Sequence, residues 1–369
     1  MTTAGIIAEY NPFHNGHKYH IEKTREITGA DGIVVAMSGN FVQRGDAAIC
    51  DKWSRAKMAL MGGADLIVEL PCVYSCQSAE YFAKGAVSIL ENLKCNFLSF
   101  GTEIDNIDEI IEIAEFLKNP DDNFKKILDG NLQKGMSYPR ALSKAIGKDT
   151  VNTPNNVLAI EYVKHIKSMK PVGIKREGSL HDGTGSASDI REKISNKEDT
   201  NHLMPESSYE ILQNTTLTDR KTFGSLLLYK LRTINPEQLR KVPDVTEGLE
   251  NRILQIAHKC TSFEELCNSV KTKRYTMARI RRIMTNALLD ITKEDVSKLP
   301  EYIRVLGMNK NGMEILSQLR DNTNIPIITK VADAKASRML QLDINATNIY
   351  SVLTGKPSMM DFTTSPIIF

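Results

Sequence analysis

The sequence predicts an α/β fold, with a doubly wound parallel sheet followed by a mainly α-helical C-terminal domain. In the first half of the chain, short apolar runs alternate with segments of helical length, which is typical of parallel strands joined by helices. Beyond residue 200 the strand-like runs fade, and helical patterns follow one another. The 369 residues are enough for two hydrophobic cores. We therefore expect one domain over residues 1–197 and a second over residues 198–369.

The composition is that of an ordinary globular protein, with 41% hydrophobic and 25% charged residues. The net charge of +2 does not by itself indicate a nucleic-acid binder, so any basic surface must be local. No apolar run approaches the roughly 20 residues that cross a bilayer, and we see no signal peptide. The six cysteines are scattered without C-x-x-C spacing, so we expect reduced thiols in a cytoplasmic protein without membrane contact.

The predicted strands of the first domain cover residues 4–8, 33–37, 65–70, 97–100 and 171–174. The helical patterns between the first four strands cover residues 17–28, 52–61 and 79–92. Strand, helix and strand at this spacing form right-handed units with parallel strands. Residues 104–150 look mostly helical, and we interpret them as an insertion without chemistry.

Ligands of such sheets bind beyond the carboxyl ends of the strands. Three loops fall there, at residues 11–16, 38–46 and 101–103. The second loop carries Asn40, Gln43 and Arg44, which are candidates for substrate contacts. The alternative for Arg44 is an ion pair with a surface acid such as Asp46.

The first of these loops leads from a strand into a helix, with His14 and His17 on either side of Gly16. A helix N-terminus offers unpaired N–H donors and attracts phosphate. Glycine lets a nucleotide approach the backbone, and histidines can donate hydrogen bonds to phosphate oxygens. One alternative is a loop or core histidine pair. Another is a metal site that adds His20, which we favour less because no familiar ligand spacing completes it.

The H-x-G-H pattern resembles the signature of a superfamily of adenylyl-transferring enzymes with a Rossmann-like nucleotidyltransferase fold. The full stretch Glu9–His17, followed by Met37–Phe41 and Gln43–Gly45, resembles bacterial tRNA(Met) cytidine acetate ligases. The resemblance implies that ATP, with Mg²⁺ as its companion, activates acetate as acetyl-adenylate. The wobble cytidine of elongator tRNA(Met) then becomes N4-acetylcytidine, and AMP and pyrophosphate are released. Two alternatives are a small-molecule nucleotidyltransferase and a non-catalytic, nucleotide-regulated RNA-binding protein.

The resemblance also implies the nucleotide-binding residues. It matches Gly101, Asn155 and Asn156, and Arg176 to nucleotide contacts, although an asparagine before a helix is also a good N-cap. The run Ser186–Arg191 resembles the second superfamily signature, which holds phosphates. We expect His14, His17 and Arg191 to be catalytic. The full ATP-binding prediction is Ile7, Ala8, Glu9, Tyr10, Asn11, Pro12, Phe13, His14, Asn15, Gly16, His17, Lys18, Tyr19, His20, Gly101, Asn155, Asn156, Arg176, Ser186, Ser188 and Arg191.

One segment of the second half, residues 271–282, is strongly basic and holds no acid. Its cations can meet RNA phosphates, and its tyrosine can stack on an unpaired base. The alternative is a solvated basic helix face. The family that the sequence resembles binds tRNA and carries a similar K-T-K-R-Y-T run, so the resemblance favours the RNA-binding interpretation. The predicted tRNA-binding residues are Lys271, Lys273, Arg274, Tyr275, Arg281 and Arg282.

Overall fold

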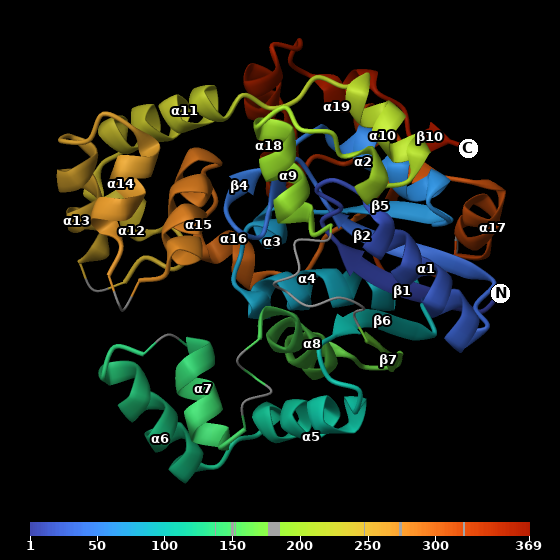
Figure 1. The fold of residues 1–369 in the computed structure, drawn as a ribbon, viewed down its shortest axis with the longest axis horizontal. Helices are drawn as coiled ribbons and strands as arrows, with labels where there is room; N and C mark the ends of the chain where they lie inside the picture. The colour runs from blue at the N-terminus through green and yellow to red at the C-terminus, as the bar shows by residue number, and fades with distance from the viewer. Residues whose placement is uncertain are drawn as a thin grey trace.

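A mainly parallel sheet forms the centre of the protein, which we describe from a computed structural model (Figure 1). The structure describes residues 1–136, 138–148, 151, 153–175, 185–246, 248–272, 275–319 and 322–369. Within these residues the strand order of the sheet is β10-β8-β5-β2-β1-β6-β7, with β9 paired to β8. The predicted α/β fold class is confirmed.

All five predicted strands are present and parallel to their neighbours in the first half of the chain. They are β1 (Thr3–Ala8), β2 (Gly32–Ser38), β5 (Leu66–Leu70), β6 (Phe97–Thr102) and β7 (Lys170–Lys175). Every residue of β2 and β5 is buried, as expected for parallel strands that are covered on both faces. The predicted helices between the strands are α1 (Asn15–Thr28), α2 (Lys52–Met61) and α4 (Ala79–Asn92), with the short α3 (Cys72–Ser75) before α4.

Two hydrophobic cores cover the two faces of the sheet. On one face, Ile21 of α1 and Met58 of α2 pack with Ile6 and Val35 of the strands. On the other face, the apolar side of α4 packs with alternate residues of the same strands, including Val34. This alternation follows from the period of two along a strand. The predicted doubly wound arrangement is therefore observed.

The insertion and the second half of the chain are mainly helical. The insertion contains α5 (Ile107–Lys118), α6 (Asp122–Gln133) and α7 (Tyr138–Ile146), which lie at the lower edge of Figure 1. Two helices, α8 (Pro154–His165) and α9 (Ala187–Ser195), flank β7 in the sequence. The later helices are α10 (Glu206–Gln213), α11 (Arg220–Thr233), α12 (Pro236–Arg240), α13 (Leu249–Ala257), α14 (Phe263–Val270), α15 (Met277–Leu288), α16 (Lys293–Ser297), α17 (Lys310–Leu319), α18 (Arg338–Thr354) and α19 (Met360–Thr363).

The end of the chain returns to the central sheet, which the sequence pattern did not predict. The sequence pattern of residues 299–339 predicts the tail of the helical region, with room for one short strand. Instead β8 (Ile303–Met308) is fully buried and pairs antiparallel with β5, while β9 (Ile327–Ile328) and β10 (Ile367–Ile368) pair with β8. The sheet therefore continues across the predicted division at residues 197 and 198, and that division stays a prediction.

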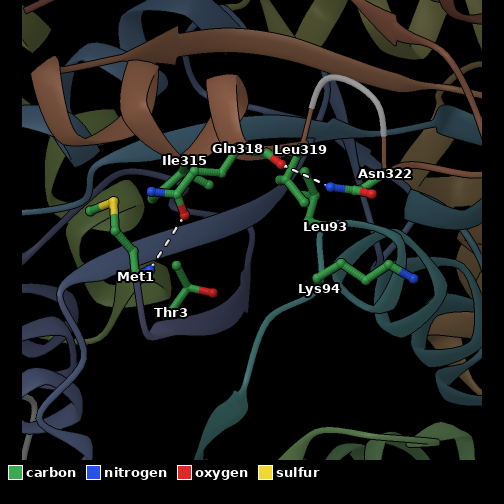
Figure 2. A pocket seen from close by; sticks show the side chains of 8 residues that line it. All are labelled: Met1, Thr3, Leu93, Lys94, Ile315, Gln318, Leu319 and Asn322. Carbon is green, nitrogen blue, oxygen red and sulfur yellow. Dashed lines mark hydrogen bonds between the residues drawn. The ribbon is translucent and has the colours of Figure 1, made fainter.

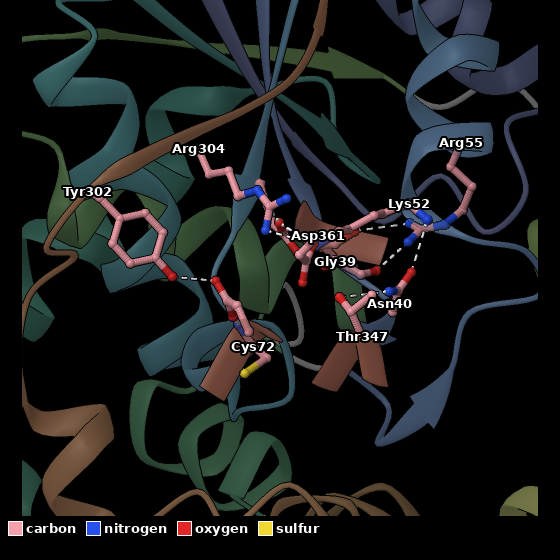
Figure 3. Close-up of polar contacts among 12 residues, drawn as sticks. Gly39, Asn40, Lys52, Arg55, Cys72, Tyr302, Arg304, Thr347 and Asp361 are labelled. Atoms are coloured by element: carbon pink, nitrogen blue, oxygen red, sulfur yellow. Dashed lines mark hydrogen bonds and ion pairs between the residues drawn. The ribbon is translucent and has the colours of Figure 1, made fainter. Parts of the chain in front are cut away.

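Buried charges connect β8 to the first half of the chain (Figure 3). The ammonium of Lys52 on α2 lies 2.7 Å from Glu69 on β5 and 2.9 Å from Asp361 on α19. Arg304 on β8 lies 2.8 Å from the same Asp361 oxygen. The side chains of Lys52, Glu69, Arg304 and Asp361 are at most 5% exposed. Tyr302 donates a hydrogen bond to Asp343 beside this cluster. The sheet thus contains a charge cluster that needs partners from both ends of the chain.

A half-buried histidine at the end of α8 makes the stability pH-dependent. Burial, followed by the nearby cations Lys164 and Lys84, lowers the pKa of His165 to about 4 from its ordinary 6.5. Between these two values the unfolded chain binds a proton that the folded chain does not. We therefore expect the free energy of unfolding to rise with pH over this window. Urea unfolding at pH 4.5 and pH 7 measures the rise, which should be smaller in the His165→Gln variant. Equal rises in both proteins would contradict this assignment.

Candidate active site

The end of β1 and the start of α1 hold the two predicted catalytic histidines. His14 is the N-cap of α1, and its Nδ1 accepts a hydrogen bond from the Gly16 N–H at 3.0 Å. The His14 N–H donates to Nδ1 of His17 at 3.2 Å. The two rings stack with their centroids 3.7 Å apart. The histidines therefore act as the reciprocal capping pair of the helix, in the place where Ser and Glu usually stand.

These backbone bonds fix which ring nitrogen carries the proton. An Nδ1 that accepts a hydrogen bond presents a lone pair, so in each neutral ring the hydrogen is on Nε2. Tyr10 packs edge-on against His17 with ring centroids 4.8 Å apart and is itself buried. The helix N-terminus thus presents two oriented imidazole N–H donors, which suits an anion with several oxygens.

The second predicted motif, residues 186–191, contacts the histidine loop. Arg191 of α9 donates to the Asn11 carbonyl oxygen at 2.6 Å and to Oγ of Ser188 at 3.1 Å. Ser186 is the N-cap of α9 and forms a capping box with Asp189, so its hydroxyl is engaged within the helix. Burial lowers the pKa of Arg191. A guanidinium stays charged at neutral pH in any case, so the structure places a cation beside the histidine loop.

The two predicted asparagines lie near the end of β6, but neither is the N-cap of α8. That position belongs to Thr153, with Pro154 as the first helical residue. Asn156 is 1% exposed and accepts from the Glu103 N–H at 3.0 Å, while Asn155 donates to the Glu103 side chain at 2.7 Å. The alternative N-cap role is therefore wrong, because Pro154 is the first helical residue and the helix begins before both asparagines. The asparagines instead hold the loop that follows Gly101.

The remaining predicted ATP-binding residues take several environments. Ile7, Ala8 and Glu9 are partly buried at the end of β1, and Phe13 is fully buried with its ring 4.9 Å from that of Tyr10. Asn15 and Lys18 are exposed on α1, where Tyr19 is partly buried. His20 contacts Oγ of Ser99 at 2.9 Å. Arg176 lies outside the described residues, so its predicted contact stays a prediction, as do the ligand roles of the others.

Arg55 is a site residue that the sequence did not reveal. Its guanidinium is fully buried and donates to carbonyl oxygens of Glu9 at 2.6 Å, Ser38 at 3.0 Å and Gly39. It also donates to the Cys50 carbonyl at 3.1 Å. These carbonyls lie at the carboxyl ends of β1 and β2 and in the following loop. Arg55 therefore ties together the loops that form the site. An arginine on a short helix gives no local sign of such burial.

In the loop after β2, Asn40 has a mainly structural role. This side chain is buried, accepts from the Lys52 N–H at 2.9 Å, and donates to Thr347 at 3.2 Å (Figure 3). Arg44 is exposed, and among the described residues no ion pair involves it. The alternative of an Arg44–Asp46 pair is therefore wrong. Asp46 instead pairs with Arg220 and Arg281.

The basic segment near residue 275 is largely engaged within the protein. The Tyr275 ring is only 9% exposed, and the Arg279 guanidinium lies 5.2 Å from its centroid. Arg282 pairs with Asp244 at 3.1 Å, whereas Lys271 is exposed. Lys273 and Arg274 lie outside the described residues. The structure does not favour base stacking by Tyr275, because its ring presents no open face; the predicted tRNA contacts remain untested.

Within the described part of the chain, no group of three or more His, Cys, Asp or Glu side chains is placed to hold a metal ion. A surface pocket begins at the amino end of β1, away from the histidines (Figure 2). It is lined by Met1, Thr3, Leu93, Lys94, Ile315, Gln318, Leu319 and Asn322. The helices that the structure describes include none with the length and apolarity of a membrane span.

A doubly wound sheet, two histidines at the opening helix and a Ser/Arg motif on a later helix define the class of nucleotidyltransferases. The family model described as HIGH Nucleotidyl Transferase matches residues 1–364. The tRNA(Met) cytidine acetate ligases of Clostridium perfringens (strain ATCC 13124) and Clostridium tetani are 42% and 40% identical, each over 100% of both chains. The chain therefore belongs to the tRNA(Met) cytidine acetate ligase family within this class, which confirms the resemblance.

The fold agrees with solved structures of Thermotoga maritima TmcAL. The form bound with alpha-thio ATP has a TM-score of 0.92 and 32% sequence identity, and the match covers 100% of both chains. The apo form has a TM-score of 0.93 at the same identity and coverage. The comparison supports an ATP-binding site in this fold.

Proposed function

We propose that the protein is an ATP-dependent ligase that acetylates the N4 amine of the wobble cytidine of elongator tRNA(Met). Acetate, ATP and the tRNA are the substrates, and N4-acetylcytidine, AMP and pyrophosphate are the products. The observation that carries the proposal is the reciprocal pair of His14 and His17 at the start of α1, in a chain whose full-length relatives are named for this activity. We infer a cytoplasmic enzyme, because its tRNA substrate is found there.

In the first step, an acetate oxygen attacks the α phosphorus of ATP, and the bond to the bridging oxygen of pyrophosphate breaks. Negative charge builds on the phosphate oxygens as this happens. The Nε2–H groups of His14 and His17 and the guanidinium of Arg191 would stabilise that charge. Arg191 is held beside the loop by the Asn11 carbonyl. The residues of the site therefore act by electrostatic positioning rather than by covalent catalysis.

In the second step, the cytidine N4 amine attacks the acetyl carbon of the mixed anhydride. The bond between the acetyl carbon and the phosphate oxygen breaks, AMP leaves, and the amine gives up one proton. A cytosine amine is a weak nucleophile, so an activated acyl group is a suitable partner. Mg²⁺ would accompany the ATP phosphates and neutralise part of their charge. We propose that the helical region after residue 197 contributes to tRNA binding.

Labelled acetate tests the function directly. Purified protein is incubated with ATP, [¹⁴C]acetate and a transcript of elongator tRNA(Met), and nucleosides are separated after digestion. Label in N4-acetylcytidine supports the proposal, and it should disappear when the wobble cytidine is replaced by uridine. AMP transfer to a small acceptor would instead support a small-molecule nucleotidyltransferase. ATP and tRNA binding without turnover would support a non-catalytic RNA-binding protein.

A further inference from the structure

A small hairpin lies between the histidine loop and the helical region. Its strands are β3 (Phe41–Val42) and β4 (Asp46–Ala47). On one side, the Gln43 N–H donates to the Glu9 side chain at 2.9 Å. On the other side, Thr285 of α15 donates to the Gly45 carbonyl at 2.9 Å. A Cβ on Gly45 would come within 2.4 Å of the Arg282 backbone nitrogen, so the hairpin and α15 are in direct contact. The hairpin therefore joins the ATP site to the helices.

The segment after the hairpin brings α11 to the same place. Ile49 donates its N–H to Asn11 at 2.8 Å, and its carbonyl accepts from the Thr218 N–H at 3.0 Å. Asn11 also receives the guanidinium of Arg191. Thr218 is two residues before the start of α11 at Arg220. Two hydrogen bonds thus connect the histidine loop with Thr218, two residues before α11.

Four arginines gather around this junction, and the carboxylate of Asp46 lies among them. Asp46 lies 3.0 Å from Arg220 and 3.6 Å from Arg281. The Arg220 side chain is 64% exposed and that of Arg281 is 30% exposed. Arg44 at the hairpin turn is exposed as well. Burial is the main cause that lowers the pKa of Arg191. The carboxylates of Glu9 and Asp46 act to raise this pKa, and the cations of Arg44 and Arg220 act to lower it, in keeping with their place around the same junction.

We propose that Arg44, Arg220 and Arg281 form a surface that binds the RNA phosphates next to the acceptor cytidine, and that Asp46 competes with those phosphates. The proposal rests on the proposed function, since the acceptor base must reach an adenylate held beside His14 and Arg191. The phosphates that flank this base then lie within about one nucleotide of the site. A phosphate, like a carboxylate, can accept two parallel hydrogen bonds from one arginine. Asp46 therefore occupies a position that suits a phosphate. By contrast, Arg279 and Arg282 of the basic segment are both bonded to Asp244.

Opposite charge changes at this surface should have opposite effects on RNA binding. In the Arg44→Ala/Arg220→Ala double variant, we expect affinity for a tRNA(Met) transcript to fall on the order of tenfold. The slope of log Kobs against log salt concentration should become less steep by about two units, because about 0.9 is lost per phosphate contact. The Asp46→Asn variant should bind the transcript ~2–5-fold more tightly, since a competing charge is gone. Filter binding at several salt concentrations measures all three quantities.

The matched control removes two exposed arginines that lie elsewhere on the protein. Arg240 pairs with Glu250 and Arg338 pairs with Asp295, so the Arg240→Ala/Arg338→Ala variant loses the same formal charge. This control should bind RNA like the wild type. Acetate-dependent ATP–pyrophosphate exchange without RNA should persist in all variants, which shows that the ATP site is folded.

Equal weakening in the control pair, or wild-type affinity in the Arg44/Arg220 variant, would overturn the proposed surface. Weaker binding by Asp46→Asn, with exchange intact, would overturn the competition by Asp46. Wild-type protein that binds the transcript but transfers no acetyl group would overturn the proposed function alone. In that case the binding measurements still decide whether the surface exists.

Discussion

The His17→Ala variant is expected to lose about 10²- to 10³-fold in acetate-dependent ATP–pyrophosphate exchange. The substitution removes one of the two Nε2–H donors at the start of α1. That donor is pre-oriented, because the His14 N–H and the stacked His14 ring fix the plane of the His17 imidazole ring and its tautomer. Charge that develops on the phosphate oxygens would then be met by water, which must reorganise. Radiolabelled pyrophosphate incorporation into ATP measures the loss.

The controls separate this catalytic loss from loss of structure. Half of the capping pair of α1 is also removed, and the loss of a cap costs about 1 kcal/mol of stability. Thermal unfolding should show only that change, and affinity for the tRNA(Met) transcript should remain that of the wild type. The exposed His258 on the end of α13 provides the matched substitution, and His258→Ala should leave exchange unaffected. Wild-type exchange in the His17→Ala variant would exclude a role in transition-state stabilisation.

The Lys52→Met variant is expected to lower the free energy of unfolding by about 3–5 kcal/mol. The lysine is fully buried between Glu69 and Asp361, and methionine has a similar shape but no charge. Its removal leaves two buried carboxylates with Arg304 as their shared ion-pair partner among the described residues. Removing one member of a buried charge cluster costs far more than the cluster itself contributes. Urea unfolding followed by circular dichroism measures the difference.

An exposed lysine offers a comparison for this second prediction. Lys23 pairs with Glu26 at the same 2.7 Å distance, but both side chains are well exposed, so Lys23→Met should cost under about 1 kcal/mol. The Lys52→Met/Glu69→Gln double variant should recover part of the lost stability, because one uncompensated charge is gone. Equal effects of Lys23→Met and Lys52→Met would show that Lys52 carries little of the stability of the cluster.

The local sequence pattern was sufficient to predict the elements whose structure is decided by neighbouring residues. The apolar run Ile33–Met37 and the glycine after Thr28 predicted β2 and the end of α1, where Gly29 has the expected left-handed φ of 61°. The histidine loop was recognisable because its residue types are unusual at a helix start. Its reciprocal hydrogen bonds, which set the tautomers, required coordinates.

Features that depend on distant partners could not be predicted. Strand β8 pairs with β5 across more than 200 residues of sequence, and Arg304 interrupts its apolar run, so no nearby signal marked it as a central strand. Lys52 and Arg55 are charges on a short helix, and nothing in the neighbouring sequence marks them as buried. The basic segment shows the converse, since Tyr275 is covered and Arg282 is paired although the sequence shows only a run of cations; its tRNA contacts stay a prediction. Charge in a sequence does not tell which partner will neutralise it.

The position of β8 has a consequence for biosynthesis. Until the ribosome has added residues 303–308, the nascent chain lacks the strand that covers one edge of β5. Lys52 and Glu69 also lack Arg304 and Asp361 at that stage. Folding of the nucleotide-binding half should therefore reach completion only after residues 303–361 have left the ribosome. A nascent chain stalled at residue 300 should remain protease-sensitive, so ATP binding would be delayed until β8 and Asp361 are in place.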